Sequence, residues 1–410
     1  MLEGPSFLIL RDMPSSCEDE SKWIHNAYCV IELSSNKLPM KDEQDNQDHG
    51  EDHSDSSSLI HQLGRDITTK CLLHCSRSDY GAIASLNKAF QSLIRSGELY
   101  EQRLKMGIME HWIYFSCNLM EWEAFDPIRR RWMHLPRVNV NRNDCFMCSD
   151  KESLAVGTEL LVFGKEIMSY VVYKYSILTN TWSSGTCMNV PRCLFGSASL
   201  GKTAILAGGC DPRGNILSVT ELYNSTTGTW ELIPSMNKAR KMCSGVFMDG
   251  KFYVIGGIGT DDRKILTCGE VYDLKTMTWT VIPNMFPPRN GRVGGTEVYA
   301  VTEAPPLVAV VNNELYAADH VLQEVRKYDK QNNFWVRLGK LPEEADSVNG
   351  WGLAFRACGD QLIVVGGPRS EFEGVIELNA WVPSEGHPEW NVLARRPSAS
   401  FVYNCAVMGC

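Results

Sequence analysis

Tryptophan returns at an almost constant interval through the C-terminal part of this chain, and no other feature constrains the fold as strongly. The six residues that share the spacing are Trp132, Trp182, Trp230, Trp279, Trp335 and Trp390. Successive members lie 50, 48, 49, 56 and 55 residues apart, and a repeat near 50 residues is typical of the four-stranded blades of a β-propeller. Five of them follow an aromatic residue by seven positions, namely Phe125, Tyr175, Tyr223, Tyr272 and Tyr328. We therefore predict β-sheet blades with these tryptophans buried between them, serving packing rather than chemistry.

Paired glycines form a second marker with the same period. They end apolar, strand-like runs at 207–209, 255–257 and 365–367. Glycine allows the backbone to turn tightly where neighbouring segments crowd together. The pair is absent from the first repeat, reduced to Gly164 in the second and replaced by Ala317-Ala318 in the fifth. The repeat is therefore incomplete but regular.

The two ends of the repeat region predict how the propeller closes. The first repeat starts with His111-Trp-Ile-Tyr-Phe, which corresponds to a second strand, and no first strand precedes it. The C-terminus supplies an extra strand, residues 401–408. Exposed sheet edges invite pairing with other chains, so we predict that the two ends pair and complete six blades within residues 107–410. Loss of the last ten residues should then destabilise the whole domain.

Residues 59–106 follow a different pattern. Apolar residues recur there at helical steps of three and four: Leu59, Ile60, Leu63, Ile67, Leu72, Ile83, Leu86, Phe90, Leu93 and Ile94. Ser78-Asp79 could cap a helix that starts near Tyr80, and Gly97 marks its end. These features predict a small all-α module of two or three helices.

The net negative charge of the chain comes entirely from its N-terminal residues. Of 49 acidic and 40 basic residues, giving a net charge of −9, residues 1–58 hold 13 acidic and 4 basic, which leaves 36 of each in the remainder. Residues 41–58 contain no apolar side chain and cannot bury enough surface to offset ordering. We predict a mostly disordered acidic leader over 1–58. A nucleic-acid partner is not expected, because the chain lacks a basic surface pattern.

Sequence motifs for secretion, membrane spanning, metal binding and catalysis are missing. The chain has 15 cysteines but no signal peptide, and no apolar run approaches the roughly 20 residues of a membrane span. We therefore expect a reducing, intracellular compartment and no membrane partner. Cys145-Phe-Met-Cys148 has no second pair to complete a zinc site. No Gly-x-Ser-x-Gly, Walker or His-Glu-x-x-His pattern occurs, so we predict no catalytic residue, metal or cofactor.

Taken together, the repeats resemble kelch repeats. The segment Leu59–Tyr80, LIHQLGRDITTKCLLHCSRSDY, continuing through 84–93, resembles an F-box. A variable leader, one F-box and a kelch propeller, in this order, is similar to the plant F-box/kelch-repeat proteins, and the resemblance covers residues 59–410. It implies an all-β six-bladed kelch propeller preceded by a small all-α F-box module and the disordered acidic leader.

The resemblance also implies a function. F-box proteins are substrate-recognition subunits of Skp–cullin–F-box ubiquitin ligases: the F-box binds the Skp adaptor, and the propeller holds a protein substrate. A nuclear or cytoplasmic location would follow. Adaptor-binding candidates, which could alternatively close only the module's own core, are Leu59, Ile60, Leu63, Ile67 and Leu72. The competing hypothesis is a non-ligase scaffold that binds proteins through the propeller alone, with the helices as a packing cap.

Arginines at equal offsets in the repeat are candidates for substrate binding. Arg192, Arg240 and Arg289 each follow their repeat's tryptophan by ten residues. A ring of guanidiniums would suit an acidic or phosphorylated peptide; the alternative is that each arginine bonds carbonyls or a nearby acid within its own inter-blade loop. Polar insertions at 211–215, 259–264 and 287–292 interrupt the repeat and are better placed for specificity. The candidates in them are Asp211, Arg213, Asp261, Arg263 and Arg292.

Overall fold

The structure of the chain is a computed structural model. It describes residues 64–118, 121–138, 152–165, 170–261, 265–286, 304–343, 345, 347, 349–367, 374–383, 387–398 and 401–409. The predicted acidic leader lies outside these residues. Within these residues, four α-helices and a short 3₁₀ helix (η1) precede six four-stranded antiparallel sheets. The helix bounds are α2 Arg65–His74, η1 Arg77–Asp79, α3 Tyr80–Leu86, α4 Lys88–Arg95 and α5 Glu98–Lys105.

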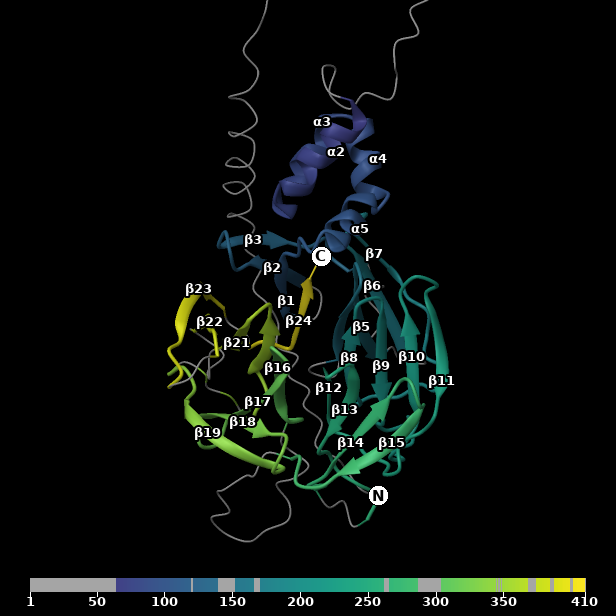
Figure 1. Ribbon diagram of the computed structural model, residues 1–410, viewed down its shortest axis with the longest axis vertical. Coiled ribbons are helices and arrows are strands. Elements are labelled where there is room, and N and C mark those ends of the chain that lie inside the picture. The colour runs from purple at the N-terminus through teal and green to yellow at the C-terminus, as the bar shows by residue number, and fades with distance from the viewer. Residues whose placement is uncertain are drawn as a thin grey trace, which may run out of the picture. The chain divides into compact units, whose positions relative to one another are not determined.

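The six sheets are the blades of a propeller, and the prediction of a six-bladed all-β fold is confirmed (Figure 1). Blade 1 contains β24 Asn404–Gly409, β1 His111–Asn118, β2 Glu121–Asp126 and β3 Arg131–His134. Blade 2 contains β4 Ser153–Val156, β5 Glu159–Lys165, β6 Tyr170–Ser176 and β7 Thr181–Ser184. Blade 3 contains β8 Gly196–Leu200, β9 Thr203–Ala207, β10 Thr220–Asn224 and β11 Thr229–Ile233.

The remaining three blades repeat this order without interruption. Blade 4 contains β12 Ser244–Met248, β13 Lys251–Ile255, β14 Gly269–Asp273 and β15 Thr278–Ile282. Blade 5 contains β16 Leu307–Val311, β17 Glu314–Asp319, β18 Glu324–Asp329 and β19 Phe334–Lys340. Blade 6 contains β20 Ala354–Cys358, β21 Gln361–Gly366, β22 Val375–Trp381 and β23 Asn391–Pro397. Within each blade we call the strands first to fourth in the order given.

The ends of the repeat region close the ring as predicted. In Figure 1 the yellow β24 lies beside the blue β1, although most of the chain separates them. Their register runs antiparallel from His111 opposite Gly409 to Ser116 opposite Asn404. The C-terminal strand is therefore the first strand of blade 1, and it covers the edge of β1 that would otherwise be exposed.

The seven-residue spacing of aromatic and tryptophan is a cross-strand register. In blades 1 to 5 the two side chains stand directly opposite each other on the third and fourth strands, with ring centroids 4.8–5.4 Å apart. Several indoles also reach the preceding blade: Trp230 Nε1 donates to the Thr186 carbonyl at 2.8 Å, and Trp279 Nε1 donates to that of Pro234 at 2.7 Å. Of the six tryptophans only Trp230 is buried and the others are half-buried, so the prediction that all six are buried was wrong for five of them.

Two glycine pairs have the backbone conformation that their spacing predicted. Gly208 and Gly209 have φ of 72° and 98°, and Gly256 and Gly257 have φ of 64° and 96°. A Cβ at Gly209 would lie 2.4 Å from the Cys193 carbonyl oxygen. Glycine is required at this turn because the backbones approach so closely.

The apolar core is divided among the contacts between neighbouring blades. Six clusters of buried side chains each join one blade to the next around the ring. The cluster between blades 1 and 2 also contains buried residues of the helices, including Leu73, Tyr80 and Leu99. Helix α3 begins at Tyr80 as predicted, although Asp79 makes no capping bond. The prediction that this helix continues to Gly97 was wrong, because α3 ends at Leu86 and the separate helix α4 follows it. None of the described helices is long and apolar enough to cross a bilayer.

Candidate protein-binding site

The propeller has two faces with different connections. The first-to-second and third-to-fourth strand turns lie on one side, which we call the hairpin face. The second-to-third connections and the links between blades lie on the other, which we call the loop face, and in the described residues it includes 185–195, 208–219 and 234–243. The helices contact the hairpin face: Glu101 meets Lys202 at 3.5 Å and Asp79 meets Arg131 at 3.4 Å. The loop face is thus the side of the ring away from these helix contacts.

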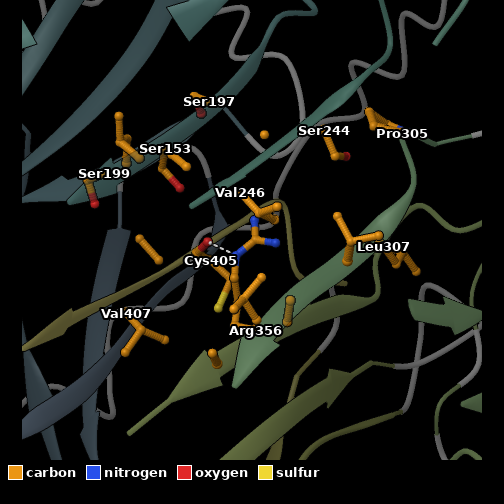
Figure 2. A pocket seen from close by; sticks show the side chains of 18 of the residues that line it. Ser153, Ser197, Ser199, Ser244, Val246, Pro305, Leu307, Arg356, Cys405 and Val407 are labelled. Atoms are coloured by element: carbon orange, nitrogen blue, oxygen red, sulfur yellow. Dashed lines mark hydrogen bonds between the residues drawn. The ribbon is translucent and has the colours of Figure 1, made fainter. Parts of the chain in front are cut away.

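A channel of about 290 Å³ runs along the propeller axis. All six first strands line it, together with link residues such as Glu152 and Pro305 near the loop face. Figure 2 shows Arg356 pointing into this space, where Nε donates to the Cys405 carbonyl at 2.9 Å. The hydroxyl-bearing residues that line it are Ser153, Ser197, Ser199 and Ser244. The channel therefore offers one cation and several hydroxyl groups to a polar group entering from the loop face.

Two of the three repeated arginines, Arg192 and Arg240, do not line this surface, which corrects a prediction made from their spacing. Arg192 and Arg240 have no exposed surface. Arg192 is ion-paired to Glu221 and donates to the Val190 carbonyl at 2.8 Å and that of Leu206 at 3.2 Å. Burial lowers the pKa of Arg192, and the bond to Glu221 opposes that effect. The guanidiniums hold inter-blade links, because a buried charge needs a close partner.

The arrangement in blade 4 matches that in blade 3. Arg240 Nη2 meets Glu270 Oε1 at 2.6 Å, and Nη1 donates to the carbonyls of Gly256 at 2.9 Å and Cys268 at 3.1 Å. Glu270 also accepts from the Asn237 backbone at 2.8 Å. Neither glutamate was predicted from the sequence. The sequence did contain a sign of them, since each glutamate stands two residues before its repeat's tyrosine, and the two are 49 residues apart.

The candidate residues in the loop insertions differ in whether their side chains are free for a partner. Asp211 folds its own loop: its carboxylate accepts from the backbone of Arg213 at 2.9 Å and of Asn215 at 2.8 Å. The Asn215 side chain also donates to this carboxylate, at 2.8 Å. That bond first, and then the two backbone bonds, hold the pKa of Asp211 below its usual value. The side chains of Arg213 and Asp261 are exposed. The other three candidates lie outside the described residues: Arg263, Arg289 and Arg292.

The predicted adaptor-binding residues separate into two groups. Ile67 on α2 is 53% exposed and is accessible to a partner. Leu86 at the end of α3, which was not among the predicted adaptor-binding residues, is also accessible, with 69% of its surface exposed. Leu72 is buried in the core shared by helices and blades 1 and 2. Its assignment to the adaptor surface is therefore corrected, because its apolar surface is already covered within the chain. The other three candidates, Leu59, Ile60 and Leu63, lie outside the described residues.

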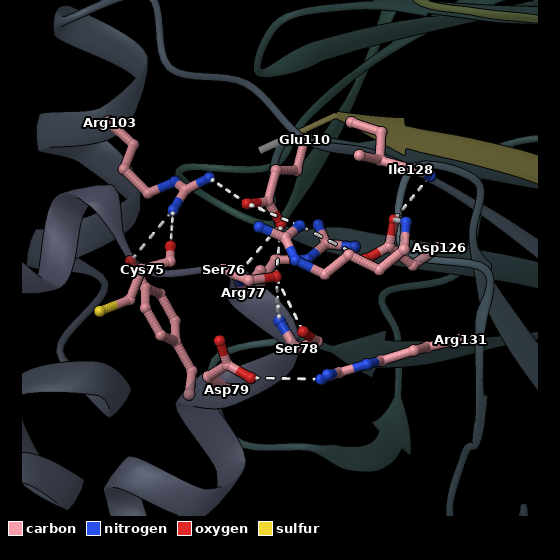
Figure 3. A network of polar contacts seen from close by, with 12 residues as sticks. Cys75, Ser76, Arg77, Ser78, Asp79, Arg103, Glu110, Asp126, Ile128 and Arg131 are labelled. Atoms are coloured by element: carbon pink, nitrogen blue, oxygen red, sulfur yellow. Dashed lines mark hydrogen bonds and ion pairs between the residues drawn. The ribbon is translucent and has the colours of Figure 1, made fainter.

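A buried ionic network, which the sequence analysis did not anticipate, joins the helices to blade 1 (Figure 3). Arg103 on α5 is fully buried. Its Nη1 donates to the carbonyl of Leu73 at 3.1 Å and of Cys75 at 2.7 Å, and its Nη2 lies 3.1 Å from Glu110 Oε1. Glu110, just before β1, thus connects the two parts of the chain.

Arg77 makes the second half of this junction. Its backbone nitrogen donates to Glu110 Oε2 at 3.0 Å, and its guanidinium lies 4.2 Å from the centre of the Trp112 ring. Nη2 donates to the Tyr114 hydroxyl at 3.1 Å. A cation held against an aromatic face in the interior adds to the attraction between the two surfaces. The network and the shared core fix the helices against the propeller.

Comparison with known proteins places these features in a family. A family model described as "Kelch motif" matches residues 191–237 and 239–286, the region of the two buried arginine–glutamate pairs. The F-box/kelch-repeat protein At1g74510 of Arabidopsis thaliana is 58% identical, with 100% of both chains covered. The chain belongs to the plant F-box/kelch-repeat family.

Two further F-box/kelch-repeat proteins of Arabidopsis thaliana share this similarity. SKIP11 is 62% identical over 98% of this chain and 86% of its own length. At1g26930 is 59% identical over 90% of this chain and 87% of its own length. In this F-box/kelch-repeat protein the helices α2–α5 are thus the F-box module, and the six blades are the kelch propeller. Within the described residues no group of three or more histidine, cysteine or acidic side chains is arranged to hold a metal.

Proposed function

We propose that this F-box/kelch-repeat protein is a substrate-recognition subunit of a Skp–cullin–F-box ubiquitin ligase. Its F-box would bind a Skp-type adaptor and through it a cullin–RING ligase, and its propeller would capture a protein substrate. The ubiquitin transfer would be performed by other subunits, so the chain itself would act without catalysis or a cofactor. Such a protein would work in the nucleus, the cytoplasm or both.

The observation that carries the proposal is the division of surfaces between the helices and the propeller, which pack against each other. Exposed apolar side chains remain on the F-box, with Ile67 at 53% and Leu86 at 69%. Apolar side chains left exposed on a small helical module are suited to burial against a partner. The ion pair of Arg103 with Glu110 and the shared core hold this module on the hairpin face of the propeller.

The loop face supports the other half of the proposal. It presents the exposed Arg213 and Asp261 and leads to the channel that contains Arg356. Variable loops on a fixed scaffold are the usual place for recognition. An adaptor on the hairpin side and a substrate on the loop side would not compete for the same surface.

The direct test is co-purification of the full-length chain with a plant Skp-type adaptor. We expect a stable complex, and we expect Ile67→Asp to weaken it at least tenfold, because a carboxylate would have to be buried in the interface. The matched control is Leu232→Asp, since Leu232 is 57% exposed but lies on β11 of the propeller. This variant should bind the adaptor as the wild type does.

The scaffold hypothesis makes the opposite prediction. A protein that uses only the propeller would not retain the adaptor, even when circular dichroism shows that it is folded. Adaptor binding that is equally reduced by both aspartate variants would also reject the proposed surface. Substrates can then be sought by proximity labelling with the wild type and with Ile67→Asp, which should label the same substrates but stabilise them against degradation.

A further inference from the structure

Two cysteines face each other at the loop-face end of blade 3. Cys193 precedes β8 and Cys210 follows β9. Their backbones form an isolated antiparallel bridge, with Cys193 N donating to the Cys210 carbonyl at 3.0 Å and Cys210 N donating to that of Cys193 at 2.8 Å. The two sulfur atoms are 3.7 Å apart. Neither cysteine takes part in a disulfide.

This geometry allows a disulfide with little backbone movement. Residues in a hydrogen-bonded antiparallel pair have Cα atoms about 5.5 Å apart, within the range of roughly 4.4–6.8 Å that disulfides span. Gly209 permits the approach, because a Cβ there would collide with the Cys193 carbonyl oxygen at 2.4 Å. Rotation of the two cysteine side chains would bring their sulfur atoms from 3.7 Å to bonding distance.

The surroundings of the pair make one sulfur the better nucleophile. The Cys193 thiol, which is placed to donate to the Cys210 sulfur, and the Lys241 cation lower the pKa of Cys210. The pKa of Cys193 is raised in turn by this bond to Cys210 and by burial. Tyr170 places its hydroxyl 3.7 Å from the Cys193 sulfur. A thiolate is the form of cysteine that reacts with oxidants.

We propose that Cys193 and Cys210 form a reversible oxidation site, a dithiol that hydrogen peroxide converts to a disulfide. The Cys210 thiolate attacks the peroxide O–O bond, which forms a sulfenic acid and releases hydroxide. The Cys193 sulfur then attacks that sulfur, forming the S–S bond and releasing the oxygen as water. Two thiols and one peroxide thus give one disulfide and two water molecules, and a dithiol reductant returns the two electrons.

The disulfide would link the loop that contains Asp211 and Arg213 covalently to the segment just before β8. Asp211 directly follows Cys210, and Cys210 also bridges Ile216 on the other side of the same loop. Oxidation would therefore restrain one of the variable loops of the loop face. This inference concerns the chain alone and stands whether or not the chain serves a ubiquitin ligase.

The test is peptide mapping of the purified full-length protein before and after hydrogen peroxide treatment, with free thiols blocked by N-ethylmaleimide. We expect a peptide pair joined through Cys193 and Cys210, lighter by two hydrogens than its separate peptides, which disappears after dithiothreitol. The site would be refuted by oxidation of the exposed Cys187 without this cross-link, or by a Cys187–Cys193 disulfide in its place.

Two variants separate the roles of the sulfurs. Cys193→Ser should lose the cross-link completely and accumulate a Cys210 sulfenic acid that dimedone labels, whereas the wild type should show little labelling. Cys187→Ala is the matched control, because Cys187 lies close to the backbone of Tyr170, and it should keep the cross-link. Dimedone labelling of Cys210 that is equal in the wild type and Cys193→Ser would show that Cys193 does not resolve the sulfenic acid, and would overturn the proposal.

Discussion

Blades 3 and 4 differ from blades 5 and 6 at one equivalent position. It lies on the third strand, two residues before the aromatic residue that packs on the repeat's tryptophan, which in blade 6 is Trp381. Blades 3 and 4 have Glu221 and Glu270 there, each paired with a fully buried arginine. In blade 5 the position holds Arg326, which lies 3.3 Å from Asp319 and 3.4 Å from Glu324. In blade 6 it holds Asn379, which donates to Glu377 at 2.8 Å.

The difference shows that the blade fold does not require one particular residue at this position. All four blades have the same strand order, yet the charge at this position is negative, positive or absent. A buried polar group needs a partner of complementary charge or hydrogen-bonding capacity, whatever its own sign. The matches to the kelch motif cover only blades 3 and 4, whereas blades 5 and 6 satisfy the same position with other partners.

The largest effect should come from the strand that closes the ring, since no side-chain pair can substitute for it. Deletion of 401–410 removes β24, uncovers the edge of β1 and takes Met408 and Cys405 out of two core clusters. We expect loss of cooperative thermal unfolding by circular dichroism and aggregation on size exclusion. A truncated protein that melts within a few degrees of the wild type would contradict the importance of this closure.

A large but smaller effect is expected for Arg240→Ala. It leaves Glu270 without its guanidinium in a fully buried position, which typically costs about 3–5 kcal/mol of unfolding free energy. Urea denaturation measures this loss. Because the charge itself causes the penalty, Arg240→Ala combined with Glu270→Gln should cost less than the sum of the two single changes. Strict additivity would argue that the pair does not interact.

The exposed pair of blade 6 should respond weakly to the same treatment. The Arg395 side chain is 64% exposed, although its partner Glu377 is buried. Arg395→Ala should cost no more than about 1 kcal/mol, since solvent screens the arginine and Asn379 still donates to Glu377. The same urea assay decides the comparison: a loss as large as that of Arg240→Ala would mean that exposure does not distinguish the two blades.

The smallest effect concerns pH and the first residue of β1. Burial, reinforced by the Arg77 cation, lowers the pKa of His111 below its ordinary value of 6.5. The unfolded chain therefore binds more protons than the folded protein below that pH, and His111 reduces stability as the pH falls from about 6.5 toward its folded-state pKa. In His111→Gln this part of the pH dependence should vanish. Parallel unfolding curves of the two proteins from pH 7 to 5.5 would contradict the assignment.

The sequence predicted the fold well because its signals are local and repeated. The seven-residue spacing reports a hairpin register, and the positions of His111 and the last strand revealed how the ring closes. The candidate site was predicted less well. The equal spacing of Arg192 and Arg240 correctly placed them at equivalent points of the ring, but spacing carries no information on whether a side chain faces solvent or a buried glutamate.

The sequence by itself determined the number of blades, the family and the order of F-box and propeller, since periodicity and motifs lie in neighbouring residues. Only the tertiary structure revealed the pairing of Arg103 with Glu110, the burial of Leu72 and the approach of Cys193 to Cys210. These contacts join segments that belong to different strands or to different parts of the chain. Their existence depends on how the blades and helices pack, because burial and distance are properties of the folded chain and not of any local pattern.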